Sequence, residues 1–224
     1  MSSLNSLRNF YRSLQKRHPS ILVHGSASPN QIALTFDDGP HPRDTPQVLD
    51  VLAKQDVQAT FFLIGQSVER YPHPVKQIYD AGHQLAIHCY RHIPFPIEIA
   101  STLMGGLNRS RNAIAKACGI SPESIRHVRP PYGFFTARIL SRLNESGYRL
   151  VLWDNMPLHF IQPIQRTVDQ ILTHTLPGSV IVLHDGKGHG RKVAAIVDTI
   201  IPMLKAKGFA FMRIEDMEKD RFNE

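Results

Sequence analysis

Short apolar runs alternate with longer stretches of helical periodicity along most of this chain. Seven short runs rich in β-branched and aromatic residues predict buried strands. These strands are Gln31–Phe36, Thr60–Leu63, Gln84–Ile87, His127–Arg129, Arg149–Leu152, Val180–Leu183 and Phe209–Arg213. Six longer patterns, with apolar residues three and four apart, predict helices. These helices are Pro46–Lys54, Ser67–Ala81, Ile97–Cys118, Ala137–Ser146, Pro163–Thr175 and Lys192–Lys207. Strands that alternate with helices favour parallel pairing through right-handed crossovers, so we expect an α/β fold with a closed or nearly closed barrel.

Local signals support the ends of these helices. Thr45 followed by Pro46 predicts a helix start, with the threonine hydroxyl as cap and proline at the first helical position. Four helical runs are followed by glycine, the residue that most easily adopts the left-handed conformation at a helix end. These glycines are Gly82, Gly119, Gly147 and Gly208. The 224 residues are enough for one sizeable core.

The first 27 residues differ in character from the rest. They hold basic residues among Leu, Phe and Tyr, and they lack the apolar core of a secretory signal. We therefore expect residues 1–27 to form an N-terminal arm or surface helix, followed by one domain over residues 28–224. A surface helix is favoured over a weak membrane-surface contact. The missing signal favours a cytoplasmic location and leaves action at the cell envelope open.

Charge and cysteine content narrow the function classes. The net charge of +7 suits nucleic acid, anionic lipid or an acidic polymer. Lys and Arg are, however, spread along the chain without the basic motifs of nucleic-acid-binding folds, so no nucleic-acid partner is expected. The two cysteines, Cys89 and Cys118, do not indicate a disulfide framework and favour a reducing compartment.

Polar and ionisable residues gather where the predicted strands end. Asp37 and Asp38 end the first strand, His88 and His92 follow the third, and Arg129 ends the fourth. The fifth strand is followed by Trp153 and Asp154, and the sixth by His184 and Asp185. Each feature alone is weak evidence for an active site. Adjacent aspartates, for example, usually lie in solvated turns. Together they place five strand ends with reactive groups on the face of the barrel where active sites collect.

These residue types can build a metal-dependent hydrolase. His88 and His92 are four residues apart, a spacing that lets two imidazoles bind one ion. One carboxylate would complete a three-ligand site with open positions for water and substrate. Adjacent aspartates at a strand end point in different directions, so one can bind metal while the other acts as general base. Arg129 could orient that base, and a histidine from the opposite rim could protonate the leaving amine.

The same residues resemble the polysaccharide deacetylases, the family with the NodB-homology domain also called carbohydrate esterase family 4. Thr35–Pro40, with its two aspartates, looks like their first motif, and His88–His92 looks like their metal-binding motif. Arg129–Gly133 and Val182–Asp185 look like the third and the last motif. The motifs follow the family's order from about Gln31 to Ile214.

The resemblance implies a distorted (β/α)7 barrel that holds one divalent ion, Zn²⁺ first, with Co²⁺, Ni²⁺ or Mn²⁺ as alternatives. It implies that Asp38, His88 and His92 are the metal ligands. It also implies that Asp37 is the general base and His184 the general acid.

Further roles concern orientation and substrate. The resemblance implies that Arg129 orients the base and that the Tyr132 backbone N–H contributes to an oxyanion hole. Trp153 and Leu183 would border the pocket for the acetyl methyl group. The implied reaction uses a water activated by the ion to remove N-acetyl groups from N-acetylglucosamine units of a chitin-type or peptidoglycan-type glycan or oligosaccharide.

Two motifs depart from the family pattern. Cys89 stands where Ser or Thr is usual, and a thiol is a weaker hydrogen-bond partner that could in principle bind metal. Met156 and His159 stand at two positions usually held by aspartate, and Phe160 replaces a tryptophan. A histidine cannot serve as the anionic partner of His184, and if charged it would lower the pKa of that residue. Asp154 or Asp185 could take over the role.

These departures keep two other hypotheses open. The first is the same metal-dependent barrel acting on a different small or lipid-linked amide. The second is a non-catalytic glycan- or membrane-binding protein that retains the barrel. The complete set of base, ligands, arginine and acid argues against the second.

Overall fold

A single curled parallel sheet organises the chain. The computed structural model describes residues 2–26, 30–186 and 188–222. The strands run in the order β1-β6-β5-β4-β3-β2-β7, with β8 beside β2, and every strand pair is parallel. Their bounds are β1 Ile21–Leu22, β2 Gln31–Asp37, β3 Thr60–Ile64, β4 Gln84–Cys89, β5 His127–Val128, β6 Arg149–Val151, β7 Val180–His184 and β8 Ala210–Met212. The predicted α/β barrel of about seven strands is confirmed.

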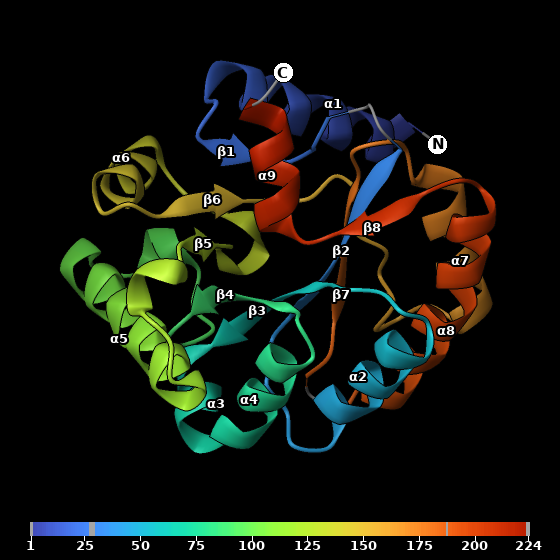
Figure 1. Cartoon of the computed structure of the whole chain (residues 1–224). Coiled ribbons are helices and arrows are strands. Elements are labelled where there is room, and N and C mark those ends of the chain that lie inside the picture. The colour runs from blue at the N-terminus through green and yellow to red at the C-terminus, as the bar shows by residue number, and fades with distance from the viewer. Residues whose placement is uncertain (1, 27–29, 187, 223–224) are drawn as a thin grey trace.

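Helices surround this sheet (Figure 1). Their bounds are α1 Ser2–Arg17, α2 Asp44–Lys54, α3 Gly65–Arg70, α4 Pro72–Asp80, α5 Ala100–Cys118, α6 Ala137–Glu145, α7 Ile164–His174, α8 Gly190–Ala206 and α9 Ile214–Phe222. Three short 3-10 turns cover Phe95–Ile97, Pro122–Ser124 and Pro131–Gly133. Among the described residues, the helices are too short or too polar for any of them to cross a membrane.

The core lies inside the curl of the sheet and between sheet and helices. Strands β3 and β4 are buried along their whole length, as expected for parallel strands covered on both faces. Phe36 and Phe61 stack at a ring-centroid distance of 4.9 Å on neighbouring strands. Fully burying such a side chain stabilises the fold by about 1.5–3 kcal/mol. This packing fixes the strands whose far ends carry the polar motifs.

Helix α9 closes one end of the barrel. The backbone N–H of Ile214 donates to Thr60 Oγ1, and that of Glu215 donates to Gln84 Oε1. A Glu218 carboxylate oxygen lies 3.1 Å from His127 Nε2. Thr60, Gln84 and His127 are the first residues of β3, β4 and β5. Helix α9, in front of the sheet in Figure 1, therefore covers the N-terminal ends of the strands and leaves the opposite end for the site.

The seam between the edge strands β1 and β7 is nearly closed. His24 pairs with Ser179 in an isolated antiparallel bridge, and Asn155 pairs with Ile181 in a parallel one. The amide nitrogen of Asn155 also donates to Thr175 Oγ1 at 3.1 Å. The segment after β6 therefore fills the gap that a missing strand would leave.

The arm predicted over residues 1–27 contains a helix and a strand. Helix α1 is followed by β1, which pairs with β6. Gln15 anchors the helix, since its side-chain oxygen accepts from the backbone N–H of His24 and its nitrogen donates to the His24 carbonyl. Residues 27–29 lie outside the described part, so the division at residue 27 stays a prediction. The sheet, however, already begins at Ile21.

Several predicted boundaries were wrong for local reasons. The helix expected over Ser67–Ala81 is two helices, because Pro72 cannot continue α3 and instead begins α4. The helix expected from Ile97 begins at Ala100 after a 3-10 turn. Thr45 does not cap α2, which begins at Asp44 without a side-chain cap. The Thr45 hydroxyl instead accepts from the His41 N–H and donates to Asp185. The four glycines predicted at helix ends all have positive φ.

His83, at the start of β4, makes the stability of the fold depend on pH. Its Nδ1 accepts from the backbone N–H of Ala59, and burial lowers the pKa of its imidazole to about 4. An unfolded histidine titrates near pH 6.5, so the unfolded chain binds this proton first as pH falls. We predict that His83 lowers the free energy of unfolding by about 2 kcal/mol between pH 6.5 and 4.5, and contributes nothing to the slope above that window.

Urea unfolding of the wild type and His83→Gln at both pH values measures this effect. The glutamine oxygen can still accept from Ala59 but does not titrate. The wild type should lose more stability on acidification than the variant. The same loss in both proteins would contradict the assignment.

Candidate active site

Three side chains of types that can bind metal converge at the C-terminal ends of β2 and β4. Asp38 Oδ1 lies 3.1 Å from His92 Nε2 and 3.5 Å from His88 Nε2. Their ligand atoms all lie within 4.8 Å of one another. His88 Nδ1 is 2.9 Å from the carbonyl oxygen of Arg129, a hydrogen bond that places the proton on Nδ1 and leaves the Nε2 lone pair facing Asp38.

The ionisation states suit a cation. Burial tends to raise the pKa of the Asp38 carboxyl, but the hydrogen bond from His92 and the nearby imidazole charges outweigh it and hold that pKa well below its ordinary value. Burial lowers the pKa of His88 to about 4. At neutral pH the carboxylate is therefore anionic and the His88 imidazole neutral, the forms in which both residues bind metal. One oxygen and two nitrogen donors fit a divalent ion with open positions.

The turn after β2 separates the two aspartates. Asp37 is the last residue of β2 and pairs in register with His184 of β7. Asp38 adopts φ +74°, a left-handed conformation that is rare outside glycine. A Cβ atom on Gly186 would lie 2.8 Å from the Asp38 carbonyl oxygen, so glycine is required for this close approach. The turn directs Asp38 toward the histidines, while Asp37 stays in the sheet.

Arg129 holds Asp37 in a buried ion pair. Its Nη1 donates to Asp37 Oδ1 at 2.7 Å and to Thr35 Oγ1 at 2.8 Å. Its Nη2 donates to the Leu152 carbonyl at 3.1 Å, and its guanidinium lies 3.9 Å from the ring centroid of Phe62. The arginine is fully buried, and burial lowers its pKa from an ordinary value that is very high. It remains a cation and fixes one carboxylate oxygen of Asp37.

His184 ends β7, the strand next to β2, so it is the neighbour of Asp37 and does not lie on the opposite rim as expected; a second histidine lies beside it. The rings of His184 and His159 stack with centroids 5.1 Å apart, and Phe160 meets His184 edge-on at 6.0 Å. His159 is fully buried, and burial, together with the neighbouring His184, lowers the pKa of His159 to about 4. His159 is therefore neutral near pH 7. From the sequence, a charged histidine at this position was expected to lower the pKa of His184. Because His159 is neutral near pH 7, it does not have this effect.

Asp154 and Asp185, the two aspartates considered as partners of His184, form hydrogen bonds and ion pairs with other groups. Asp154 accepts from the Val180 N–H at 2.9 Å, and its carboxylate lies 3.0 Å from His24 Nδ1. Asp185 accepts from Thr45, and burial raises the pKa of Asp185 to about 7. Both carboxylates therefore hold the loops around the site together.

The residues predicted to contact substrate surround the metal-binding groups. Tyr132 has a positive φ of 59°, is exposed, and meets His92 edge-on at 5.0 Å. Trp153 and Leu183 are buried. Sequence reasoning missed Tyr11 of α1, whose ring lies edge-on to Trp153 at 6.2 Å. The side chain of Cys89 is buried, and it is absent from the converging group among the described residues.

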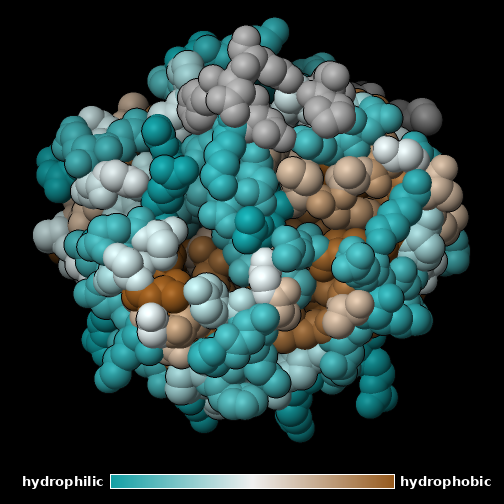
Figure 2. All heavy atoms as spheres, viewed as in Figure 1, coloured by the Kyte–Doolittle hydropathy of each residue, from teal (hydrophilic) through white to brown (hydrophobic). Residues whose placement is uncertain are grey.

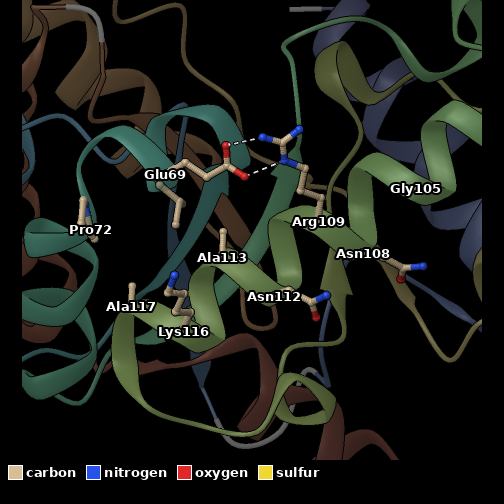
Figure 3. A pocket seen from close by; sticks show the side chains of 10 residues that line it. Glu69, Pro72, Gly105, Asn108, Arg109, Asn112, Ala113, Lys116 and Ala117 are labelled. Atoms are coloured by element: carbon tan, nitrogen blue, oxygen red, sulfur yellow. Dashed lines mark hydrogen bonds and ion pairs between the residues drawn. The ribbon is translucent and has the colours of Figure 1, made fainter.

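A hollow of about 930 Å³ lies away from the converging residues. It runs between α3, α4 and the middle of α5 (Figure 3). Glu69 and Arg109 form a two-bond ion pair in its wall, at 2.7 and 2.8 Å. It contains none of the converging residues, so it is separate from the candidate active site.

Comparison with known proteins agrees with this geometry. The family model for polysaccharide deacetylase matches residues 24–151. A chitooligosaccharide deacetylase of Azorhizobium caulinodans is 32% identical over 81% of this chain and 91% of its own length. A peptidoglycan-N-acetylglucosamine deacetylase of Bacillus cereus is 31% identical over 83% of this chain and 87% of its own.

A solved structure has the same fold. The crystal structure of the peptidoglycan N-acetylglucosamine deacetylase Bc1960 superposes with a TM-score of 0.84 at 30% identity, over 88% of this chain and 92% of that one. The chain therefore belongs to the polysaccharide deacetylase family and is a hydrolase. This confirms the resemblance seen in the sequence motifs.

The metal site can be tested directly. We predict that His88→Ala and His92→Ala each lose most of the divalent ion bound by the wild type, because each removes one of three ligands. Elemental analysis after dialysis measures the loss. His73→Ala, an exposed histidine on α4, is the matched control and should keep its metal. Full metal content in both ligand variants would refute the site.

Proposed function

We propose that this protein is a metal-dependent N-acetylglucosamine deacetylase that acts on a chitin-type or peptidoglycan-type glycan or an oligosaccharide of it. The observation that carries the proposal is the joint geometry of three groups. A ligand set of Asp38, His88 and His92 lies beside the Asp37–Arg129 pair, with His184 in register with Asp37 on the neighbouring strand β7. The names of the relatives support the amino-sugar substrate.

The ion that these three residues would hold supplies Lewis acidity, which polarises the amide carbonyl and acidifies a water. Zn²⁺ is our first choice because one carboxylate oxygen and two imidazole nitrogens with open positions suit it. Co²⁺, Ni²⁺ and Mn²⁺ are alternatives for the same donors.

The protein's own groups then move the protons. Asp37 is the general base, and because Oδ1 is fixed by Arg129, Oδ2 accepts the proton of the attacking water. His184 is the general acid and donates a proton to the nitrogen of the leaving amine. The Tyr132 backbone N–H donates to the developing oxyanion. Trp153 and Leu183 border the pocket for the acetyl methyl group.

Acetate release from N-acetylglucosamine oligomers tests this function. Metal-loaded wild type should release acetate, and Asp37→Asn should lower kcat by about 100-fold or more, because general base catalysis contributes roughly 10²–10⁴-fold. The variant should keep its metal, since Asp37 is outside the ligand set. Asp50→Asn, exposed on α2, is the control. Wild-type turnover by Asp37→Asn would rule out Asp37 as the base.

A second candidate keeps the metal centre and changes the substrate to another small or lipid-linked amide. The observation that favours it is His159, which lies buried against His184 where relatives usually have an aspartate. Full metal binding without acetate release from amino-sugar oligomers would favour this candidate.

His159 also generates a prediction on pH dependence. A neutral histidine does not stabilise the protonated form of His184 as a carboxylate would, so the basic limb of kcat/KM should lie at lower pH than in relatives with aspartate. His159→Asp should move this limb upward by about one pH unit or more. His159→Asn, which adds no charge, is the control. A limb that stays in place in His159→Asp would show that another residue supports His184.

A further inference from the structure

Exposed apolar side chains concentrate around the opening of the site. Twelve large apolar side chains are exposed in the described part of the chain, and eight of them lie in the three segments that follow β4, β5 and β6. Tyr132 and Ile164 are two of these. The other six, which we call the apolar rim, are Ile97, Ile99, Phe134, Leu158, Phe160 and Ile161. All three segments leave the C-terminal ends of parallel strands, so they share one end of the barrel.

The most exposed members of the apolar rim are aliphatic. Ile97, Ile99 and Ile161 are 73%, 75% and 72% exposed. Sugar rings are usually bound by stacking on flat aromatic faces, which a branched aliphatic side chain cannot offer. Isoleucines held this far into water instead gain free energy by entering a hydrocarbon phase. The three isoleucines are therefore better suited to lipid than to a glycan, while Phe134 and Phe160 could contact either.

Basic residues alternate with the apolar rim. The first turns of α6, α7 and α8 contain no acidic residue and carry the exposed residues Arg138, Arg166 and Arg191. A helix N-terminus is the positive end of the helix dipole, where a cation is unfavourable for helix stability. Three arginines at such positions add to a positive potential that already exists there.

Exposed acidic residues are missing from the five segments that join β2, β4, β5, β6 and β7 to the next helix. These segments are residues 38–43, 90–99, 129–136, 152–163 and 185–189, of which residue 187 lies outside the described part. Their acidic residues are Asp38, Glu98, Asp154 and Asp185, and none of these four is exposed. Exposed Arg43 and Arg91 add to the positive charge. The face seen in Figure 2, which α9 closes, is mostly hydrophilic and also shows hydrophobic patches between the hydrophilic side chains.

We propose that this end of the barrel docks on the surface of an anionic lipid bilayer. The apolar rim enters the region between headgroups and acyl chains, and Arg138, Arg166 and Arg191 contact anionic headgroups. Docking in this orientation turns the C-terminal ends of β2 and β7, which carry Asp37 and His184, toward the headgroups. It requires no helix that crosses the membrane and no contact from the N-terminal arm.

Vesicle flotation of the full chain tests the proposal without substrate, so its outcome is independent of the proposed reaction. Vesicles of phosphatidylcholine with about one quarter phosphatidylglycerol are compared with pure phosphatidylcholine. The wild type should bind the anionic vesicles more tightly, and Ile97→Ser/Ile99→Ser/Ile161→Ser should bind at least about ten-fold more weakly. Arg138→Gln/Arg166→Gln/Arg191→Gln should bind on the order of 100-fold more weakly, because a basic residue near such a surface contributes about a factor of five.

A matched charge control separates this surface from general attraction. Lys116→Gln/Lys205→Gln/Lys207→Gln removes the same charge from exposed positions on and after α5 and α8. It should leave binding within a few-fold of wild type. Equal losses in both charge variants would overturn the proposal, as would unchanged binding of the isoleucine variant.

The depth of insertion into the bilayer is measured with a polarity-sensitive dye attached to a single introduced cysteine. The native Cys89 and Cys118 are buried and should not be labelled. Dye at Ile161→Cys should shift to the blue on anionic vesicles, while dye at Met203→Cys on α8 should not. No shift at Ile161→Cys would refute insertion. A wild-type dimer that the isoleucine substitutions convert to monomer, without vesicle binding, would reassign the rim to self-association.

Discussion

The buried side chain of Arg129 is the constraint on which the rest of the site depends. Its guanidinium joins β2, through Thr35 and Asp37, to the Leu152 carbonyl that follows β6. Its backbone carbonyl accepts from His88 Nδ1 and thereby sets the tautomer of a proposed metal ligand. A buried cation is tolerated only when it is paired and hydrogen-bonded, and removing one partner of such a pair costs about 3–5 kcal/mol. The same residue therefore couples the proposed base, the ligand set and the strand spacing.

This coupling explains why the two sides of the site tolerate change differently. On the metal and base side, Asp37, Asp38, His88 and Arg129 contact one another, so a change in one disturbs the others. On the acid side, His184 meets His159 and Phe160 through ring contacts, which depend on shape more than on charge. Of the departures from the family pattern, His159 and Phe160 fall on this second side, while Cys89 is a buried thiol within the His88–His92 motif. The surroundings of His184 can therefore change without touching the proposed metal ligands.

The sequence predicted most of the fold because the spacing of apolar residues directly reflects which side chains are buried. All seven predicted strands exist, and the strand-end rule placed Asp37, Asp38, His88, His92 and Arg129 together before any geometry was known. Strand β1 was missed because two residues are too short for a periodic signal, and α9 because a helix with few apolar residues gives only a weak one. Thr45 looked like a helix cap, but a tertiary partner, the Asp185 carboxylate, uses its hydroxyl.

Contacts between distant segments could not be predicted from local patterns at all. Tyr11 meets Trp153 across more than half of the chain, and the imidazole of His24 binds the Asp154 carboxylate that follows Trp153. A Cβ atom on Gly133 would lie 2.9 Å from the Trp153 ring, so the indole is held between the β5 loop and α1. The wall of the proposed acetyl pocket thus rests on a helix that composition alone assigned to a surface arm. Because Trp153 is positioned by α1, this helix belongs physically to the active-site structure, even though it carries none of the family's motifs.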